Sequence, residues 1–259
     1  MVNNSLRDFP NRWKYVDDLS ICEVHNKKTP PNVQDQLNEL SQWTKDNNMI
    51  INIEKTNFMN ISFAKSQPIV KSFTINNIKI TNVECLKLLG VQITNDLKWN
   101  MHIHDVVNRA SKRLHMLTCL KRFGMPCNHL RQMYISHIRP VTEYACPVLH
   151  SALTIAQSME LESIQKRACR IILGQKYASY DQAIKLLNLK FLDQRREDIL
   201  LDFAKNLNKI VPNALPKLRG ETCGRILRNA KKQSEIYGNT KRFNNSCFPA
   251  LCRLINKPK

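Results

Sequence analysis

The strongest constraint on the fold is a change in the spacing of apolar residues at Trp99. Before it, apolar residues come in short runs between polar turns, a pattern typical of brief β-strands. After it they recur at helical spacing, first over residues 102–123. The sequence therefore predicts a partly β-structured region over residues 1–100 and a helical region over residues 101–216. The first helical stripe consists of Ile103, Val106, Val107, Ala110, Leu114, Leu117 and Leu120.

The first hundred residues combine one helical pattern with several strand-like pieces. Residues 33–48 carry apolar side chains at helical spacing, so we expect a helix there. Short apolar flanks around Asp17 and Asp18 predict a hairpin with the two aspartates at its tip. Further strands are expected at residues 49–53, 58–63 and 69–80, and as a pair over residues 85–94 that is interrupted at Gly90.

The helical region continues through four more segments. Pro140 should kink or break the first of them, because proline lacks an amide N–H and clashes with the preceding turn. Residues 217–259 are basic and have no clear periodicity, so we expect a poorly ordered tail. The whole pattern predicts an α+β chain with a mostly helical second half. The four segments span about residues 128–150, 154–173, 179–188 and 192–210.

The chain is strongly basic, with 40 Lys and Arg residues, 21 Asp and Glu residues and a net charge of +19. A chain this basic repels itself unless it meets a polyanion. Nucleic acid is the favoured partner, ahead of an anionic membrane surface. The surplus is concentrated over residues 195–259, which hold 15 Lys or Arg and 5 Asp or Glu, a net charge of +10.

Cysteine usage and hydropathy limit the cellular compartments in which this protein is expected. The nine cysteines are odd in number and include no Cys-x-x-Cys pair, so neither a metal finger nor a disulfide framework is expected. The N-terminus has no apolar signal region, and no apolar run approaches about 18 residues. We therefore expect an intracellular protein, nuclear or cytoplasmic, that is neither secreted nor inserted in a membrane.

Adjacent aspartates at a hairpin tip suit a divalent metal ion. Such a turn exposes the carboxylates of Asp17 and Asp18, and hard oxygen ligands match Mg²⁺. Nucleotidyl transfer uses two such ions, one to activate a 3′-hydroxyl and one to hold the leaving phosphates. Alone the pair is a weak signal, because most Asp-Asp pairs are solvated turns.

Several motifs in a fixed order make the signal more specific. Tyr15-Val16-Asp17-Asp18 resembles the metal-binding motif of reverse transcriptases. A tryptophan, an asparagine-rich turn and Asn-x-x-Lys-Thr follow it, as in reverse transcriptases of non-LTR retrotransposons. The resemblance covers about residues 12–210. Its later motifs are Cys85 to Ile93 with Leu97-Lys98-Trp99 and His102, Tyr134 to Tyr144 with Ala145, Leu161 to Gly174, and Arg195-Arg196.

The resemblance implies a partial palm sheet followed by a helical thumb, in an RNA-directed DNA polymerase that uses Mg²⁺ or Mn²⁺. Asp17 would ligate the metal directly, and Asp18 would be a weaker ligand or a second-layer partner. Lys55 resembles the lysine beside the nucleotide phosphates, where a cation can stabilise or protonate the leaving pyrophosphate. A solvated lysine at a strand end is the alternative for Lys55. Tyr15 would lie near the primer or template backbone.

The partners implied by the resemblance are an RNA template and a DNA primer. Basic residues on the first and third helices of the helical region offer contacts to their phosphates without regard to sequence. Any one of these residues is equally compatible with a solvated charged helix face. The candidates are Arg109, Lys112, Arg113, Lys121, Arg122, Lys166, Arg167 and Arg170.

The chain departs from the family's pattern at its start. A polymerase palm needs another aspartate from an earlier strand, and fingers that bind the template and the incoming nucleotide. The few residues before Trp13 supply neither. We therefore expect a half-built metal site and no appreciable polymerase activity from the chain alone. A non-catalytic, basic nucleic-acid-binding remnant is the main alternative.

A third interpretation comes from the stretch Leu88 to Trp99. It also resembles a segment from the N-terminal region of AlkB-type tRNA-modifying dioxygenases and methyltransferases. An iron dioxygenase needs His-x-Asp and a distant histidine, and none of the seven histidines begins a His-x-Asp. The chain also lacks a glycine-rich strand–helix turn for a methyl donor, so this interpretation is the weakest.

Overall fold

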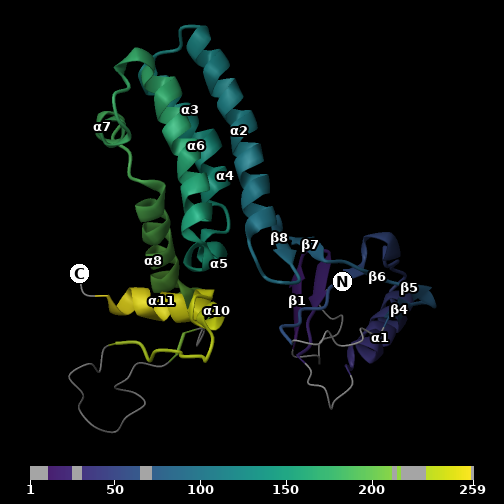
Figure 1. Cartoon of the computed structure of the whole chain (residues 1–259). Helices are drawn as coiled ribbons and strands as arrows, with labels where there is room; N and C mark the ends of the chain where they lie inside the picture. Colours follow the sequence, from purple (N-terminus) through teal and green to yellow (C-terminus); the bar gives the residue numbers. More distant parts are fainter. Residues whose placement is uncertain (1–10, 25–30, 65–71, 212–214, 217–231, 258–259) are drawn as a thin grey trace. The chain divides into compact units, whose positions relative to one another are not determined.

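The computed structural model divides the chain into two compact units, residues 1–98 and residues 99–259. The first unit combines helix α1 with short strands, and the second is built from helices (Figure 1). This mixture of helices and small strands is of the α+β kind. The residues that the structure describes are 11–24, 31–64, 72–211, 215–216 and 232–257.

Over its described residues, the first unit contains α1 and four separate strand pairs, and α1 packs against β4. Three pairs are antiparallel, and the pair of β3 with β6 is parallel. The sequence predicted a partial palm sheet, but each described strand has one partner, because strands of two to four residues offer few bonds to a further neighbour. The elements are α1 (Val33–Asp46), β1 (Arg12–Tyr15), β2 (Asp18–Ile21), β3 (Asn57–Phe58), β4 (Thr74–Ile75), β5 (Ile78–Lys79), β6 (Thr81–Asn82), β7 (Cys85–Leu88) and β8 (Val91–Thr94).

Two of the antiparallel pairs close through two-residue turns in which both residues have positive φ. Asn76 and Asn77 have φ of 50° and 64°, and Leu89 and Gly90 have φ of 46° and 81°. Positive φ at both turn positions matches the right-handed twist of the strands, and Asn and Gly adopt it at low cost. The predicted strand pair over residues 85–94, with Gly90 at its turn, is confirmed.

The strand predicted over residues 49–53 is wrong. The chain there is irregular and then enters the 3₁₀ turn η2 (Ile53–Lys55). Asn52 explains the change, because its side-chain oxygen accepts from the Lys55 N–H at 3.1 Å and its carbonyl accepts from the Thr56 hydroxyl at 2.8 Å. These local bonds compete with a strand ladder. The strand predicted at 58–63 is likewise reduced to the two residues of β3.

The second unit is built around the contact between the two long helices α2 and α6, which lie side by side in Figure 1. The helices predicted from periodicity at 102–123, 154–173, 179–188 and 192–210 are confirmed to within a few residues. The elements are α2 (Asn100–Arg122), α3 (Cys127–Met133), the π-helical turn η3 (Tyr134–Ile138), α4 (Arg139–Glu143), α5 (Cys146–Leu149), η4 (His150–Ala152), α6 (Ile155–Leu173), η5 (Gly174–Lys176), α7 (Tyr180–Leu186), α8 (Leu192–Ile210), α10 (Lys241–Asn244) and α11 (Cys247–Asn256).

Pro140 interrupts the helix as predicted. The chain runs from α3 through the wider turn η3 into α4, and Pro140 occupies the first turn of α4. Because proline has no N–H and its ring clashes with the carbonyl four residues earlier, the preceding turn opens to a π-helical spacing. Tyr134 and Ile138, at the two ends of this turn, are fully buried in the core.

The apolar core of the second unit lies between α2, η3 and α6. The stripe predicted on α2 is buried at Ile103, Val106, Ala110, Leu114 and Leu117. It packs against Leu161, Ile164, Ala168 and Ile172 of α6. None of the helices in the described part of the chain combines the length and the apolar character that crossing a bilayer requires.

The predicted poorly ordered tail, residues 217–259, needs correction for its described part. Over residues 232–257 the structure forms α10 and α11, and α11 packs against α8. Leu251 and Cys252 are fully buried in this contact. Helix α11 is only ten residues long and lies in a basic part of the sequence. Its run of apolar residues is therefore too short to predict a helix from spacing alone. Residues 217–231 lie outside the described part of the chain.

Candidate metal and nucleic-acid sites

The hairpin of β1 and β2 places the two predicted metal ligands at its tip. Tyr15 pairs with Asp18 across the ladder, so Val16 and Asp17 form the two-residue turn. The side chains of Tyr15, Asp17 and Asp18 are all exposed. The predicted geometry, a hairpin with both carboxylates presented to solvent, is therefore found.

The turn itself is strained at Val16. Its φ is 56°, a region that β-branched side chains rarely adopt. The Val16 side chain is exposed, so packing against the core does not compensate for this conformation. Strained backbone of this kind concentrates at functional sites, where the surrounding structure maintains it. Leu89 and Leu97 have positive φ as well, so the strain at Val16 belongs to the tight hairpin turn and does not by itself identify a metal site.

The donor chemistry of this turn fits a hard divalent cation such as Mg²⁺ or Mn²⁺. Asp17 and Asp18 supply carboxylate oxygens, which both ions prefer. Within the described ranges, no group of three or more His, Cys, Asp or Glu side chains lies close enough to hold a metal ion. The hairpin thus presents two carboxylates, fewer than the three or more side chains of a complete protein site.

Lys55, the third predicted catalytic residue, ends the turn η2. Its backbone is held by the Asn52 cap, whose oxygen lies 3.1 Å from the Lys55 nitrogen, and its side chain is exposed. The Asn-x-x-Lys-Thr motif is thus a capped turn, and the cap fixes the backbone position from which the Lys55 side chain extends. Within the described part of the first unit, the structure gives no contact between the Lys55 side chain and Asp17 or Asp18.

On α2, the predicted phosphate-binding residues differ in whether they already make hydrogen bonds or ion pairs within the protein. Lys112 and Arg122 are exposed and make no hydrogen bond or ion pair with another described residue. Arg109 Nε lies 2.9 Å from Asp105 Oδ2 one turn earlier, which offsets its charge locally. Lys112 and Arg122 are therefore the more available candidates.

Two other basic residues of α2 tie it to neighbouring elements. Arg113 donates to the carbonyl of His137 in η3. Lys121 Nζ lies 3.0 Å from the carbonyl oxygen of Ile172 near the end of α6. Both cations are committed to main-chain oxygens, so their role in this structure is to join helices.

The basic residues of α6 remain exposed beside tyrosine rings. Lys166 Nζ lies 5.2 Å from the centre of the Tyr180 ring, and Arg170 Cζ lies 5.4 Å from the centre of the Tyr177 ring. Such cation–π contacts position a cation without neutralising it. Arg167 donates to the Ser111 hydroxyl at 3.0 Å, which connects α6 to α2.

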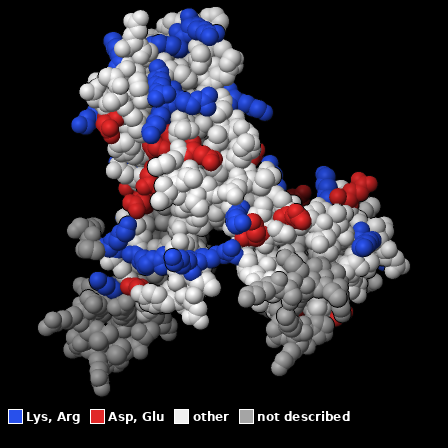
Figure 2. All heavy atoms as spheres, in the orientation of Figure 1, with Lys and Arg blue, Asp and Glu red and all other residues white. Residues whose placement is uncertain are grey.

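Lys and Arg side chains gather toward one end of the second unit. Figure 2 shows Lys and Arg side chains over the part of the unit where α2, α3 and α6 lie in Figure 1, with Asp and Glu side chains nearer its middle. Arg131, which is not among the predicted basic residues, donates to the carbonyls of Leu187 and Asn188 at the end of α7. A basic residue facing a helix end in space has no signature in the sequence.

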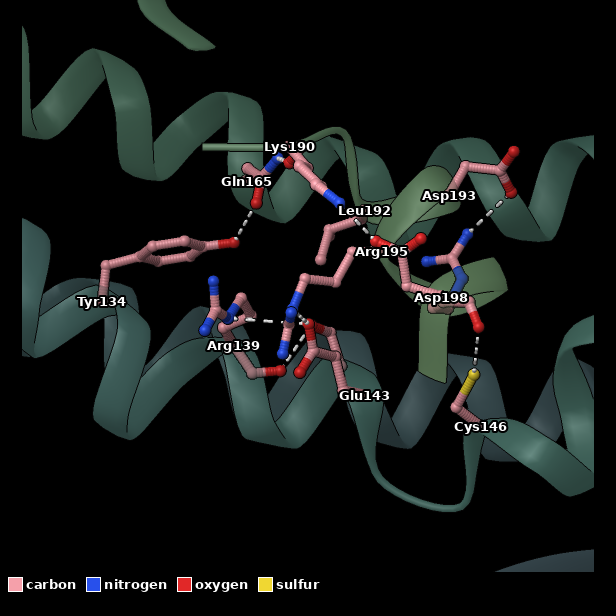
Figure 3. A network of polar contacts seen from close by, with 12 residues as sticks. Tyr134, Arg139, Glu143, Cys146, Gln165, Lys190, Leu192, Asp193, Arg195 and Asp198 are labelled. Atoms are coloured by element: carbon pink, nitrogen blue, oxygen red, sulfur yellow. Dashed lines mark hydrogen bonds and ion pairs between the residues drawn. The ribbon is translucent and has the colours of Figure 1, made fainter. Parts of the chain in front are cut away.

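The motif residues of the helical unit form a buried polar network (Figure 3). Glu143 accepts from Arg195 Nε at 2.8 Å and lies 3.5 Å from Arg139 Nε. Gln165 accepts from the Tyr134 hydroxyl at 2.6 Å and donates to the Lys190 carbonyl at 2.9 Å. The network joins η3, α4, α6 and the start of α8, so these residues act in packing.

Glu162 provides the N-terminal cap of α8 from a distance in sequence. Its carboxylate accepts from the backbone N–H groups of Leu192 at 3.1 Å and Asp193 at 3.3 Å, and from the Tyr180 hydroxyl. A carboxylate at this position satisfies free N–H groups and complements the helix dipole. Burial and the Glu162 carboxylate together raise the pKa of Tyr180 far above its ordinary value.

Arg196 is a buried cation, 1% exposed, in the same region. Its Nη2 donates to the Ser158 hydroxyl at 2.8 Å, and its Nε donates to His150 Nδ1 at 3.3 Å. Its carbonyl accepts from the Cys146 thiol at 3.5 Å. Burial raises the pKa of the Cys146 thiol to about 12, so this cysteine is a structural thiol and not a nucleophile.

Two histidines, the buried His102 and the partly buried His150, make the stability of the second unit depend on pH. Burial lowers the pKa of His102 and His150, and the positive charge of Arg196 contributes at His150. The unfolded chain therefore binds these protons more readily than the folded chain. We expect the free energy of unfolding to fall as the pH drops below about 6.5, their ordinary pKa, in denaturant titrations at a series of pH values.

The matched variant for this prediction is His150→Gln. Glutamine keeps an acceptor for Arg196 but does not titrate, so its stability should change less between neutral and mildly acidic pH. An identical pH dependence in the wild type and in His150→Gln would exclude His150 as a source of the effect.

Comparison of the chain with protein-family models, with curated proteins and with solved structures finds no match. The geometry of the hairpin and the exposed basic residues therefore carry the functional argument, together with the order of the sequence motifs.

Proposed function

We propose that the chain is part of an RNA-directed DNA polymerase of the kind found in non-LTR retrotransposons. The observation that carries the proposal is the β1–β2 hairpin, which presents a Tyr-x-Asp-Asp tetrapeptide with both carboxylates exposed around a strained turn. In this function Asp17 and Asp18 would hold Mg²⁺ or Mn²⁺, and the ion would supply positive charge for activating a 3′-hydroxyl and for binding the leaving phosphates.

Two further observations support the proposal. The Asn52 cap holds the backbone of Lys55 in a defined position. A fixed backbone suits a lysine whose charge must lie beside nucleotide phosphates. The exposed lysines and arginines of α2 and α6 suit the backbones of an RNA template and a DNA primer. Tyr15 is exposed beside the aspartates, and in this function it would contact the primer or template backbone.

The metal site is tested by adding Mn²⁺ to the isotope-labelled chain and following its amide NMR signals. Mn²⁺ broadens signals close to it, so we expect selective broadening at residues 15–18. Asp17→Asn removes one of the two carboxylates and should raise the Mn²⁺ concentration needed by about tenfold. Mg²⁺ should compete with Mn²⁺ at the hairpin, since both prefer oxygen ligands.

The control for the metal test is Asp181→Asn, which removes an exposed carboxylate from the first turn of α7. It should leave the broadening at the hairpin unchanged. Equal broadening at residues 15–18 in the wild type and in Asp17→Asn would overturn the assignment of this aspartate as a metal ligand.

A second candidate function is nucleic-acid binding without catalysis. It is favoured by the second unit, which has an apolar core of its own and carries the exposed cations of α2 and α6. Binding of an RNA–DNA hybrid that is unchanged by Asp17→Ala and by removal of divalent metal would favour this function. Primer extension on an RNA template that is abolished by Asp17→Asn would favour the polymerase.

A further inference from the structure

The C-terminal segment of the second unit exposes three aromatic rings within twelve residues. The exposed fractions are 72% for Tyr237, 44% for Phe243 and 46% for Phe248. Aromatic side chains of this size are normally among the more buried residues of a folded unit. Three of them on one short segment require an explanation other than core packing.

The segment is a closed loop held by one asparagine. Asn244 Oδ1 accepts from the Gly238 N–H at 2.9 Å, and Asn244 Nδ2 donates to the Gly238 carbonyl at 2.9 Å. The Phe243 ring lies directly on Gly238, where an added Cβ would come within 2.3 Å of the ring. The loop therefore fixes Phe243 next to the residue that follows Tyr237.

The loop is also anchored to the helical unit. Thr240 caps α10 by accepting from the Phe243 N–H at 3.2 Å, and Arg253 of α11 donates to the Asn244 carbonyl. Leu251 and Cys252 of α11 are buried against α8. The exposed rings are thus presented from a structured base.

The segment that carries the rings is also basic. Residues 232–257 contain five Lys or Arg residues and one Glu, a net charge of +4. Lys232, Lys241 and Arg242 are exposed, and the last two lie between Tyr237 and Phe243 in the loop. Figure 2 shows a band of Lys and Arg side chains where α10 and α11 lie in Figure 1.

We propose that residues 232–248 form a binding surface for single-stranded nucleic acid, with the rings of Tyr237, Phe243 and Phe248 stacking on bases. Exposed aromatics with cations around them are the arrangement that holds a single strand, because every unpaired base offers a face and every nucleotide a phosphate. A duplex offers no unstacked base between its ends, so the rings have no role in binding one. The surface is distinct from the cations on α2 and α6.

This surface goes beyond the proposed polymerase function and does not depend on it. None of its residues belongs to the motifs that resemble reverse transcriptases. Loss of hybrid binding or of metal binding would count against the proposed function and leave this surface in place. Loss of single-strand binding would count against this surface alone.

The test is fluorescence anisotropy of the full chain with labelled oligouridine and oligothymidine of about 12 nucleotides, a length within the usual site size. Tyr237→Ala should weaken binding about tenfold, while Tyr237→Phe, which keeps the ring, should bind as the wild type does. Lys241→Gln should weaken binding and lower its salt dependence, whereas Lys79→Gln, an exposed lysine of the first unit, should do neither. Tighter binding of oligouridine identifies RNA as the ligand, and equal binding identifies single strands in general.

A cross-linking experiment gives a readout that needs no variant. With 4-thiouridine in the oligonucleotide, the cross-linked peptides of the wild-type chain should include residues 232–248. Cross-links confined to α2 and α6, or single-strand binding that Tyr237→Ala leaves unchanged, would overturn the proposal.

Discussion

Replacing Glu143 by alanine should lower the free energy of unfolding of the helical unit by about 3 kcal/mol. The Glu143 side chain is only 12% exposed and lies between Arg195 and Arg139, which are 36% and 18% exposed. Its removal leaves two guanidinium groups close together without the carboxylate that compensates them. The cost is that of an unpaired, partly buried charge, which exceeds the value of the ion pair itself.

The matched control for Glu143 is Asp198→Ala. Asp198 lies 2.7 Å from Lys190, but the two side chains are 46% and 63% exposed. Water replaces the lost partner there, so the change should stay below about 1 kcal/mol. Denaturant titrations followed by circular dichroism measure both variants. Equal losses for Glu143→Ala and Asp198→Ala would show that burial does not set the strength of these ion pairs.

A double variant measures how much of the stability lost in Glu143→Ala comes from the unpaired charge of Arg195. Adding Arg195→Ala to Glu143→Ala removes one of the unpaired charges, so part of the lost stability should return. If the two changes were simply additive, Glu143 and Arg195 would not be coupled, and the 2.8 Å contact between them would contribute nothing to stability.

The parts of the fold that the sequence predicted are those set by local patterns. The α2 stripe from Ile103 to Leu117, the turn at Gly90 and the break at Pro140 each depend on residues close together in the chain. The hairpin tip at Asp17 was predictable for the same reason. A local interaction also explains the strand that was wrongly predicted over residues 49–53. The Asn52 side chain caps a 3₁₀ turn there, and this hydrogen bond competes with strand pairing.

The remaining features depend on contacts between distant residues, which a single sequence does not reveal. The Glu162 cap acts on α8 from 30 residues away. Lys121 looked like a phosphate ligand, yet a carbonyl 51 residues further on engages it. The exposed rings of Tyr237 and Phe243 could not be told from core aromatics, because exposure is a property of the folded chain. Partner and burial, not residue type, distinguish a binding cation from a packing cation.

The number of Lys and Arg residues on α2 and α6 that are free to contact phosphates determines how strongly salt should weaken binding of an RNA–DNA hybrid. Arg113 and Lys121 already bond to carbonyls, and Arg109 is paired with Asp105. About five phosphate contacts then remain, which gives a slope near −4.5 in a log–log plot of affinity against salt and a loss of roughly 500-fold between about 50 and 200 mM salt. The five remaining candidates are Lys112, Arg122, Lys166, Arg167 and Arg170.

The salt dependence can be assigned to particular residues by substitution. The double variant Lys112→Gln/Arg122→Gln removes two of the five contacts, so the magnitude of the slope should fall by about 1.8. Arg109→Gln is the matched control on the same helix, because its charge is already offset by Asp105 and its loss should leave the slope nearly unchanged. Anisotropy titrations with a labelled hybrid at several salt concentrations give all three slopes. A slope near −1 in the wild type, or equal slopes in the double variant and the wild type, would mean that α2 does not contact the nucleic-acid backbone.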